Sequence, residues 1–498
     1  MEILVFGLIA LLQLPLLLSV RSVPDDEVLC VDTALGIFRY PHVPKARYWA
    51  HVLPEMGIQN FYYTPLSFYV LALFLKVFGT RKIAVGILHG LLRFITALLV
   101  WGIGSQFGLT PLLNSLLVLS WAIFCYGPTG RPDDLALLFA VTSFYAMVVG
   151  EPTFITAGLS GIFLGLAFLS YPAALLTSFT IGAAVLMRYP LEVAVPLLAI
   201  CGMVTTAIAS LWLIWVIPYR GAFKAIFLKF ALPDARSTDR IKTLREIVRY
   251  VGAGVYTSPI PFHYSLIPVM TLTAYSAIIS PNSNLLALLG MIGALIFHFI
   301  YLSGLRIHKT YNLLFLLAAL HAFAILLLSR QLDALTANGL AAALALVLGG
   351  QVAVTVSLAL LRLIAVLSIS GRYNGQASQS LRARIPLGEA VLTNVGNAYY
   401  ALADGNPIYT VAGRTGTTYG GVPFHWEFDD RFRWLILASP IASANPYGKF
   451  NWTEVDRAFF QANFTLDTTI EVFISEPRRG LTRYAGAPET WFVYRYVG

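Results

Sequence analysis

Three consecutive carboxylates, Asp25, Asp26 and Glu27, follow directly after a long apolar segment at residues 3–20. That segment is long enough to cross about 30 Å of hydrocarbon, so the three acids are expected at a membrane surface. A carboxylate in that position can act as a general base or hold a cation. For this triplet alone, a solvated loop without a chemical role is an equally good interpretation.

A second acidic cluster, Asp133 and Asp134, opens another apolar segment and is preceded by Arg131. Ionisable groups next to hydrocarbon are costly and are functional candidates by default. If both clusters serve one aqueous site, an even number of membrane spans must separate them. The apolar segments 83–104 and 110–126 meet that condition. Together, the two clusters favour a chemical role over a solvated loop.

Basic residues gather in two later places. The stretch 217–262, which includes Lys229, has eight basic against three acidic residues, a net charge of +5. A second cluster stands just before an apolar segment and consists of Arg306, His308 and Lys309, followed by Tyr311. Such groups can neutralise a phosphate leaving group or bind lipid headgroups, and anchoring of a helix end is the alternative. No second histidine or carboxylate stands at the sequence spacing of a metal site from His308, so a metal site is not expected there. No nucleic-acid-binding motif accompanies the basic residues.

The composition sets the class of protein. Charged residues make up 12% and hydrophobic residues 57% of the 498 residues, whereas a typical soluble domain has about 25% charged residues. So little polar surface does not cover several soluble cores. This excludes a soluble multidomain enzyme and also a disordered or fibrous protein. The sequence predicts a polytopic α-helical membrane protein.

About eleven transmembrane helices are expected. The apolar segments are 3–20, 83–104, 110–126, 134–150, 154–169, 172–187, 192–216, 263–280, 284–303, 311–329 and 339–370. The apolar run 66–78 is too short to span and is expected to lie at the interface, within a first outer loop of about residues 21–82. This count puts the N-terminus inside and the loop 217–262 outside, although the usual inward bias of Lys and Arg argues against it.

The chain divides near residue 371, after which charged residues become about twice as frequent. Strand-like runs follow at Glu389–Val395, Pro407–Ala412, Trp434–Ser439, Thr469–Ser475 and Thr490–Val497. Trp452–Asn463 is helix-like with Asn451 as its expected cap, and Asp429-Asp430 is expected to start a surface helix. We therefore expect a transmembrane domain over 1–371 and a small soluble, extracytoplasmic α/β domain over 372–498.

The order of these features resembles the GT-C fold glycosyltransferases, especially the bacterial branch related to protein mannosyltransferases and aminoarabinose transferases. The resemblance is best over residues 20–190. The motifs are the acidic residues after the first span, Tyr63-Thr-Pro65-Leu66, Phe78-Gly79 ending a short helix, Gly-Arg131-Pro-Asp133 opening a later span, and His308-Lys309-Thr-Tyr311. The chain departs from the family in having three acids where members commonly show one Asp-Glu pair, and Thr64 where many have proline.

The resemblance implies a catalytic base at Asp26, with Asp25 and Glu27 as neighbours able to take its place. It implies acceptor positioning or metal binding at Asp133, with Asp134 and Arg131 beside it. The residues expected to bind the donor phosphate are Lys229, Arg306, His308, Lys309 and Tyr311. No cofactor is firmly implied, although a divalent cation, Mg²⁺ or Mn²⁺, fits the pattern.

The implied activity is transfer of a hexosyl or pentosyl group from a polyprenyl-phosphate donor to an acceptor hydroxyl, with inversion, at the outer face of the plasma membrane. The acceptor is a lipid, a glycan or a protein. Two other classes stay open. A secondary transporter also places charges in spans, but neither repeated halves nor paired interrupted helices are visible. A membrane-anchored binding or assembly protein for envelope polysaccharide would use its spans as a scaffold alone.

Overall fold

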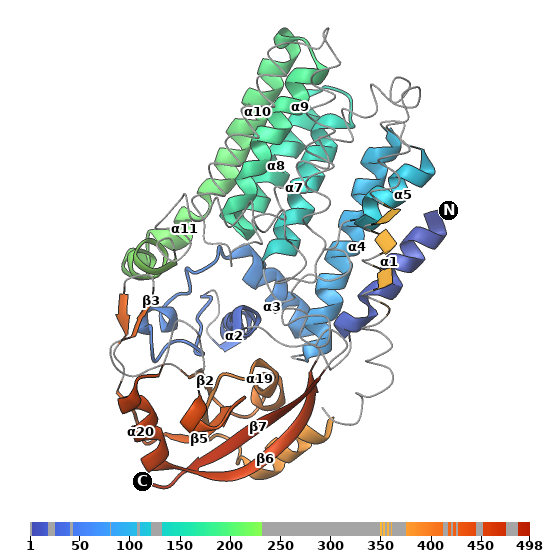
Figure 1. Ribbon diagram of the computed structural model, residues 1–498. Helices are drawn as coiled ribbons and strands as arrows, with labels where there is room; N and C mark the ends of the chain where they lie inside the picture. The colour runs from blue at the N-terminus through green and yellow to red at the C-terminus, as the bar shows by residue number, and fades with distance from the viewer. Residues whose placement is uncertain are drawn as a thin grey trace.

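The computed structural model of the chain has a helical bundle at one end and a β-sheet at the other (Figure 1). It describes residues 2–17, 25–39, 43–79, 81–106, 110–120, 132–231, several positions between 349 and 360, 375–411, 417–419, 422–424, 427–444, 452–474 and 487–498. Two further helices, α2 and α3, lie between the bundle and the sheet.

The described helices of the bundle coincide with the first seven apolar segments. They are α1 (Glu2–Leu17), α4 (Lys82–Gln106), α5 (Pro111–Ser120), α7 (Asp133–Val148), α8 (Phe154–Ser170), α9 (Thr177–Arg188) and α10 (Leu191–Ser210), which continues into α11 (Leu213–Val216). Among the described residues, Lys82–Gln106 and Leu191–Val216 are long and apolar enough to cross a membrane. The expected spans 263–280, 284–303 and 311–329, and most of 339–370, lie outside the described residues, so the count of eleven stays a prediction.

Close packing of α8 on α10 depends on small residues. A Cβ atom at Gly161 would lie 2.6 Å from the carbonyl oxygen of Cys201, and one at Gly165 would lie 2.5 Å from Cβ of Ile208. The hydroxyl of Thr205 donates to the carbonyl of Cys201 at 2.7 Å, within its own helix. Small residues four apart allow such close approach between membrane helices. Gly161 and Gly165 therefore allow α8 and α10 to approach closely.

The acidic triplet does not lie in a loop, as the sequence analysis expected, but in the first turn of α2 (Asp25–Arg39). The helix dipole stabilises carboxylates at the N-terminus of a helix, and it likewise stabilises the cationic side chain of Arg39 in the last turn of α2. The expected interfacial helix is confirmed as a helix by α3 (Leu66–Phe78), which ends at Gly79 with a φ of 80°. Glycine adopts this left-handed conformation without a Cβ clash.

The C-terminal region forms a five-stranded sheet in the order β2-β1-β5-β7-β6 among its described residues. The strands are β1 (Ala390–Thr393), β2 (Ile408–Thr410), β5 (Phe432–Leu437), β6 (Phe464–Ile474) and β7 (Ala487–Tyr496). β1 runs parallel to β2 and β5, whereas β7 is antiparallel to β5 and β6. The five strand-like runs in the sequence are thus confirmed, and α19 (Gly396–Leu402) follows β1. A short hairpin of β3 (Thr417–Tyr419) and β4 (Val422–Phe424) was not expected.

Two details of this region differ from the sequence interpretation. The helix α20 (Glu454–Asn463) is capped by Thr453, whose hydroxyl accepts from the backbone N–H of Asp456 at 3.1 Å. The expected cap Asn451 lies outside the described residues. Asp429 does not start a helix either, because its carboxylate accepts from the backbone N–H of Arg431 at 2.9 Å in the turn before β5.

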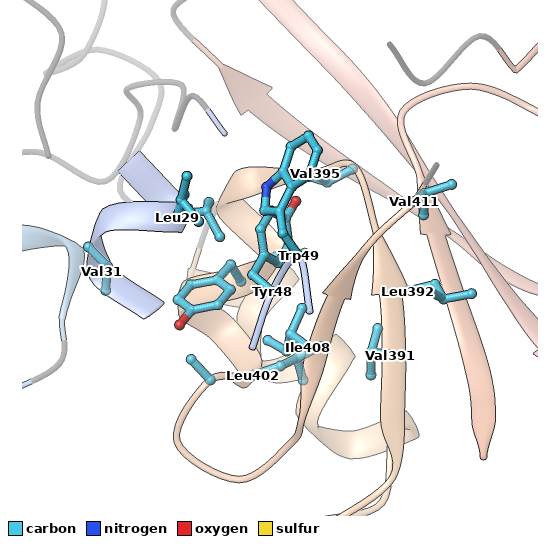
Figure 2. Close-up of a cluster of buried hydrophobic side chains, with 14 of the residues drawn as sticks. Leu29, Val31, Tyr48, Trp49, Val391, Leu392, Val395, Leu402, Ile408 and Val411 are labelled. Atoms are coloured by element: carbon cyan, nitrogen blue, oxygen red, sulfur yellow. The ribbon is translucent and has the colours of Figure 1, made fainter. Parts of the chain in front are cut away.

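One hydrophobic core joins the sheet to α2 and to the segment 46–63 (Figure 2). Tyr48 connects this segment to the sheet by two hydrogen bonds. Its carbonyl accepts from the backbone N–H of Thr410 at 2.8 Å, and its hydroxyl donates to the carbonyl of Thr393 at 3.2 Å. The segment after α2 therefore packs against the edge strand β2 and the end of β1, which fixes α2 relative to the sheet.

His51 in the same segment provides a pH-dependent contribution to stability. Its ring lies 5.5 Å from that of Tyr409 and 5.7 Å from that of Phe432, between centroids. Burial, assisted by the charge of Arg431, lowers the pKa of His51 to about 3. The folded protein thus keeps this histidine neutral between pH 6.5 and 3, while the unfolded chain binds a proton. We expect its contribution to the free energy of unfolding to be lost as the pH falls below 6.5, by at most about 1.4 kcal/mol per pH unit.

Thermal unfolding of detergent-solubilised protein between pH 7.5 and 5 measures this contribution. His51→Phe is the matched control, because an aromatic ring replaces an aromatic ring without a titratable group. The variant should lose less stability than the parent on acidification. Equal losses in both proteins would show that His51 does not control the pH dependence.

Candidate active site

The first acidic cluster lies where α2 meets the C-terminal region. The side chain of Glu27 is fully buried, and its Oε1 accepts a hydrogen bond from the hydroxyl of Tyr400 at 2.7 Å. Asp26 is only partly buried. Asp25 is the first residue of the helix. Of the two described carboxylates, Asp26 is the one that solvent or a substrate can reach.

A further acid on α2, Asp32, was missed by the sequence analysis. Its carboxylate is 1% exposed and accepts from the backbone N–H of Tyr48 at 2.7 Å and from the hydroxyl of Tyr399 at 3.1 Å. Burial raises the pKa of Asp32, against the opposing charge of Arg47. The available signal was a single acid within the largely apolar run 28–38. Its partners show that it holds α2 in place.

The second acidic cluster begins α7. Asp133 and Asp134 are 4% and 3% exposed. Oδ2 of Asp134 lies 2.6 Å from Nδ1 of His89 and accepts from Nε of Arg93 at 3.0 Å. Both partners lie on α4, four residues apart and hence on one face. Neither residue was predicted as part of the site, although a histidine and an arginine inside an apolar span are a recognisable signal.

A small cavity of about 20 Å³, with room for about one water molecule, lies among α2, α3, α4 and α7. Its lining includes Cys30, Phe68, Leu71, Leu88, His89, Pro132 and Leu135. Cys30 stands one turn after Asp26 on α2, and Pro132 directly precedes Asp133. The cavity is therefore bordered by residues within one turn of both acidic clusters. Among the described residues, no group of three His, Cys, Asp or Glu side chains could hold a metal ion, and the divalent cation stays a prediction.

Most of the residues expected to bind the donor phosphate lie outside the described residues. Arg131, Arg306, His308, Lys309 and Tyr311 lie outside the described residues. Lys229 lies in a π-helix, η3 (Phe223–Ala231), that follows α12 (Arg220–Ala222). The expected loop 217–262 therefore begins as helix, because Ala222 and Ile226 bury apolar side chains in the core shared by α2 and the sheet. The basic clamp stays a prediction.

Solved structures with a similar fold include two crystal structures of ArnT, the aminoarabinose transferase of Cupriavidus metallidurans. The apo structure has a TM-score of 0.58 and 11% identity, and the comparison covers 99% of this chain and 97% of ArnT. For ArnT bound to undecaprenyl phosphate, the TM-score is 0.58, the identity 12% and the coverage 99% and 98%. An oligosaccharyltransferase of Archaeoglobus fulgidus gives a TM-score of 0.48 at 12% identity over 92% of this chain and 71% of that one.

No protein-family model matches the sequence, and no curated protein matches it. The likeness to ArnT is one of fold and extends over nearly the whole chain. The GT-C fold expected from the order of motifs is thereby confirmed.

Proposed function

From the GT-C fold that this chain shares with ArnT, we propose that the protein is a glycosyltransferase that moves a sugar from a polyprenyl-phosphate donor to an acceptor hydroxyl. Two observations support the proposal. ArnT has been crystallised with undecaprenyl phosphate, a carrier of this chemical class. In this chain, the small cavity among α2, α3, α4 and α7 is bordered by Cys30, one turn after Asp26, and by Pro132, which directly precedes Asp133. The fold shared with ArnT carries the proposal, and the cavity supports it because its lining brings the first turns of α2 and α7 near each other.

Asp26 is the proposed base. Glu27 is buried and held by Tyr400, whereas the partly exposed Asp26 can meet an acceptor. The acceptor oxygen forms a bond to the anomeric carbon while the bond from that carbon to the phosphate oxygen breaks. The hydroxyl proton passes to Asp26, and the lipid phosphate leaves as an anion. Backside attack of this kind inverts the configuration.

The leaving phosphate needs charge stabilisation more than a proton, because it is already a stable anion. Lys229, Arg306, His308 and Lys309, with Tyr311, are the residues proposed for that role. Asp133 is proposed to orient the acceptor, alone or through a divalent cation. Asp134 is engaged by His89 and Arg93, so we assign it to holding the start of α7. Assays with a hexosyl donor and with a pentosyl donor determine which of the two sugars the protein transfers.

We place the reaction at the outer face of the plasma membrane. In that arrangement the segment between α2 and α3 and the C-terminal sheet lie outside, and the turn between α7 and α8 lies inside. Single cysteines at Ile58 and Val455, which are 50% and 69% exposed, should react with an impermeant reagent in intact cells. A cysteine at the exposed Glu151 should react only after permeabilisation. Reaction of Ile58→Cys and Val455→Cys from opposite sides would contradict the shared outer site.

A transfer assay with purified protein separates this function from the alternatives. A polyprenyl-phosphate sugar and a mixed pool of envelope acceptors should yield free polyprenyl phosphate and a glycosylated product in equal amounts. A transporter would move the lipid-linked sugar without releasing the phosphate. An assembly protein would bind it without turnover. Restoration of activity by Mg²⁺ or Mn²⁺ after EDTA treatment tests the cation.

A further inference from the structure

The C-terminal region reaches the acidic helix through two neighbouring tyrosines on α19. The hydroxyl of Tyr400 donates to Oε1 of Glu27 at 2.7 Å, and that of Tyr399 donates to Oδ1 of Asp32 at 3.1 Å. Figure 1 shows α19 on the sheet side of α2. The two tyrosines follow each other directly, but the acids that they contact are five residues apart. α19 is therefore attached to α2 at its first turn and again further along.

The contact of Tyr399 with Asp32 is buried, and that of Tyr400 with Glu27 is partly buried, because Tyr400 itself is partly exposed. Glu27 is 0% exposed, Asp32 1% and Tyr399 1%. Burial and the nearby Asp32 carboxylate raise the pKa of Tyr399 well above its usual value, so its hydroxyl keeps the proton that it donates. Asn397, three residues before Tyr400 on α19, accepts at Oδ1 from Nζ of Lys82 at the start of α4 at 2.6 Å. α19 thus connects the acidic helix with a helix that lines the cavity.

Fixing Glu27 also fixes the direction of its neighbour. Successive residues of an α-helix point about 100° apart, so the rotational setting of Glu27 determines where Asp26 projects. The first turn of a helix is the part that frays most readily. The hydrogen bond from Tyr400 to the buried Glu27 side chain restrains this turn.

We propose that Tyr400 is a positioning residue that orients the catalytic base Asp26 by holding Glu27, so that the C-terminal region takes part in the chemical step and does not only cover the site. This inference rests on the proposed glycosyl transfer. The contact of Tyr400 with Glu27 gives the C-terminal region a direct hold on the first turn of α2, which carries Asp26.

Tyr400→Phe tests the proposal, because it removes one hydroxyl and keeps the ring. The kcat of transfer should fall about tenfold, equivalent to roughly 1.4 kcal/mol of transition-state stabilisation. The KM for the donor should stay nearly unchanged, since Tyr400 contacts the acidic turn and not the donor. Tyr399→Phe is the matched control. It removes the neighbouring hydroxyl from Asp32, and should lower the thermal unfolding temperature while leaving kcat within about twofold.

A double-mutant cycle shows whether Tyr400 acts through Glu27. In a Glu27→Met background, which removes the acceptor of the Tyr400 hydrogen bond, Tyr400→Phe should lower kcat by less than about twofold. A full tenfold effect in that background would overturn the proposal, as would a parental kcat for Tyr400→Phe alone. Asp26→Asn, assayed in parallel, separates this failure from failure of the function: if Asp26→Asn is inactive but Tyr400→Phe is not impaired, glycosyl transfer stands and the positioning role falls.

Discussion

Replacing Asp26 with asparagine is expected to lower the rate of sugar transfer by about 10²–10⁴-fold, the usual contribution of a general base. Asparagine has nearly the size of aspartate and keeps hydrogen-bonding atoms, but it does not take the proton of the acceptor hydroxyl. The side chain lies in the first turn of α2 and is partly exposed, so its amide should disturb the packing of the helix little. The affinity for the donor should therefore stay nearly unchanged, as measured by binding of a polyprenyl phosphate.

Four further variants make this result specific. Glu471→Gln changes an exposed carboxylate on β6 and should leave transfer at the parental rate. If Asp26→Asn is active while Asp25→Asn or Glu27→Gln is inactive, the site is retained but the base is misassigned. If all three changes in the triplet and Asp133→Asn leave transfer intact, the displacement mechanism is wrong.

The structure explains why only part of this site could be read from the sequence. Strands such as β5 and β7 follow from local apolar runs, and α3 from a short run ending at Gly79, because local patterns determine local structure. Asp26 and Asp133 were found because acids next to apolar segments stand out. The bond between Tyr400 and Glu27 joins residues 373 positions apart, and no local pattern carries such a pairing.

The helical state of α2 was missed for a different reason. Three acids and a preceding proline indicate a loop when they are considered alone. In the structure they form the acidic first turn of a helix whose apolar residues Leu29 and Val31 are buried together with Tyr48 and the sheet (Figure 2). The helix is therefore stabilised by contacts with residues from the other end of the chain. Tertiary packing of this kind commonly outweighs intrinsic propensity.

The ion pair behind the second acidic cluster should dominate the stability of the bundle. Oδ2 of Asp134 lies 2.9 Å from a terminal guanidinium nitrogen of Arg93, whose side chain is 1% exposed. Asp134→Leu removes the carboxylate but leaves the guanidinium charge buried. Breaking one side of a buried ion pair typically costs about 3–5 kcal/mol. We expect the variant to show a large drop in unfolding temperature in detergent, or to accumulate poorly in the membrane.

The double variant Asp134→Leu/Arg93→Met distinguishes loss of the pair from loss of packing. Removing both charges takes away the uncompensated guanidinium, and apolar pairs of similar volume commonly replace buried ion pairs without loss of stability. The unfolding temperature of the double variant should therefore return most of the way to that of the parent. If the double variant is as unstable as Asp134→Leu alone, the carboxylate acts through His89 or through the start of α7 and not by neutralising Arg93. If Asp134→Leu unfolds at the parental temperature, the ion pair contributes little to the stability of the bundle.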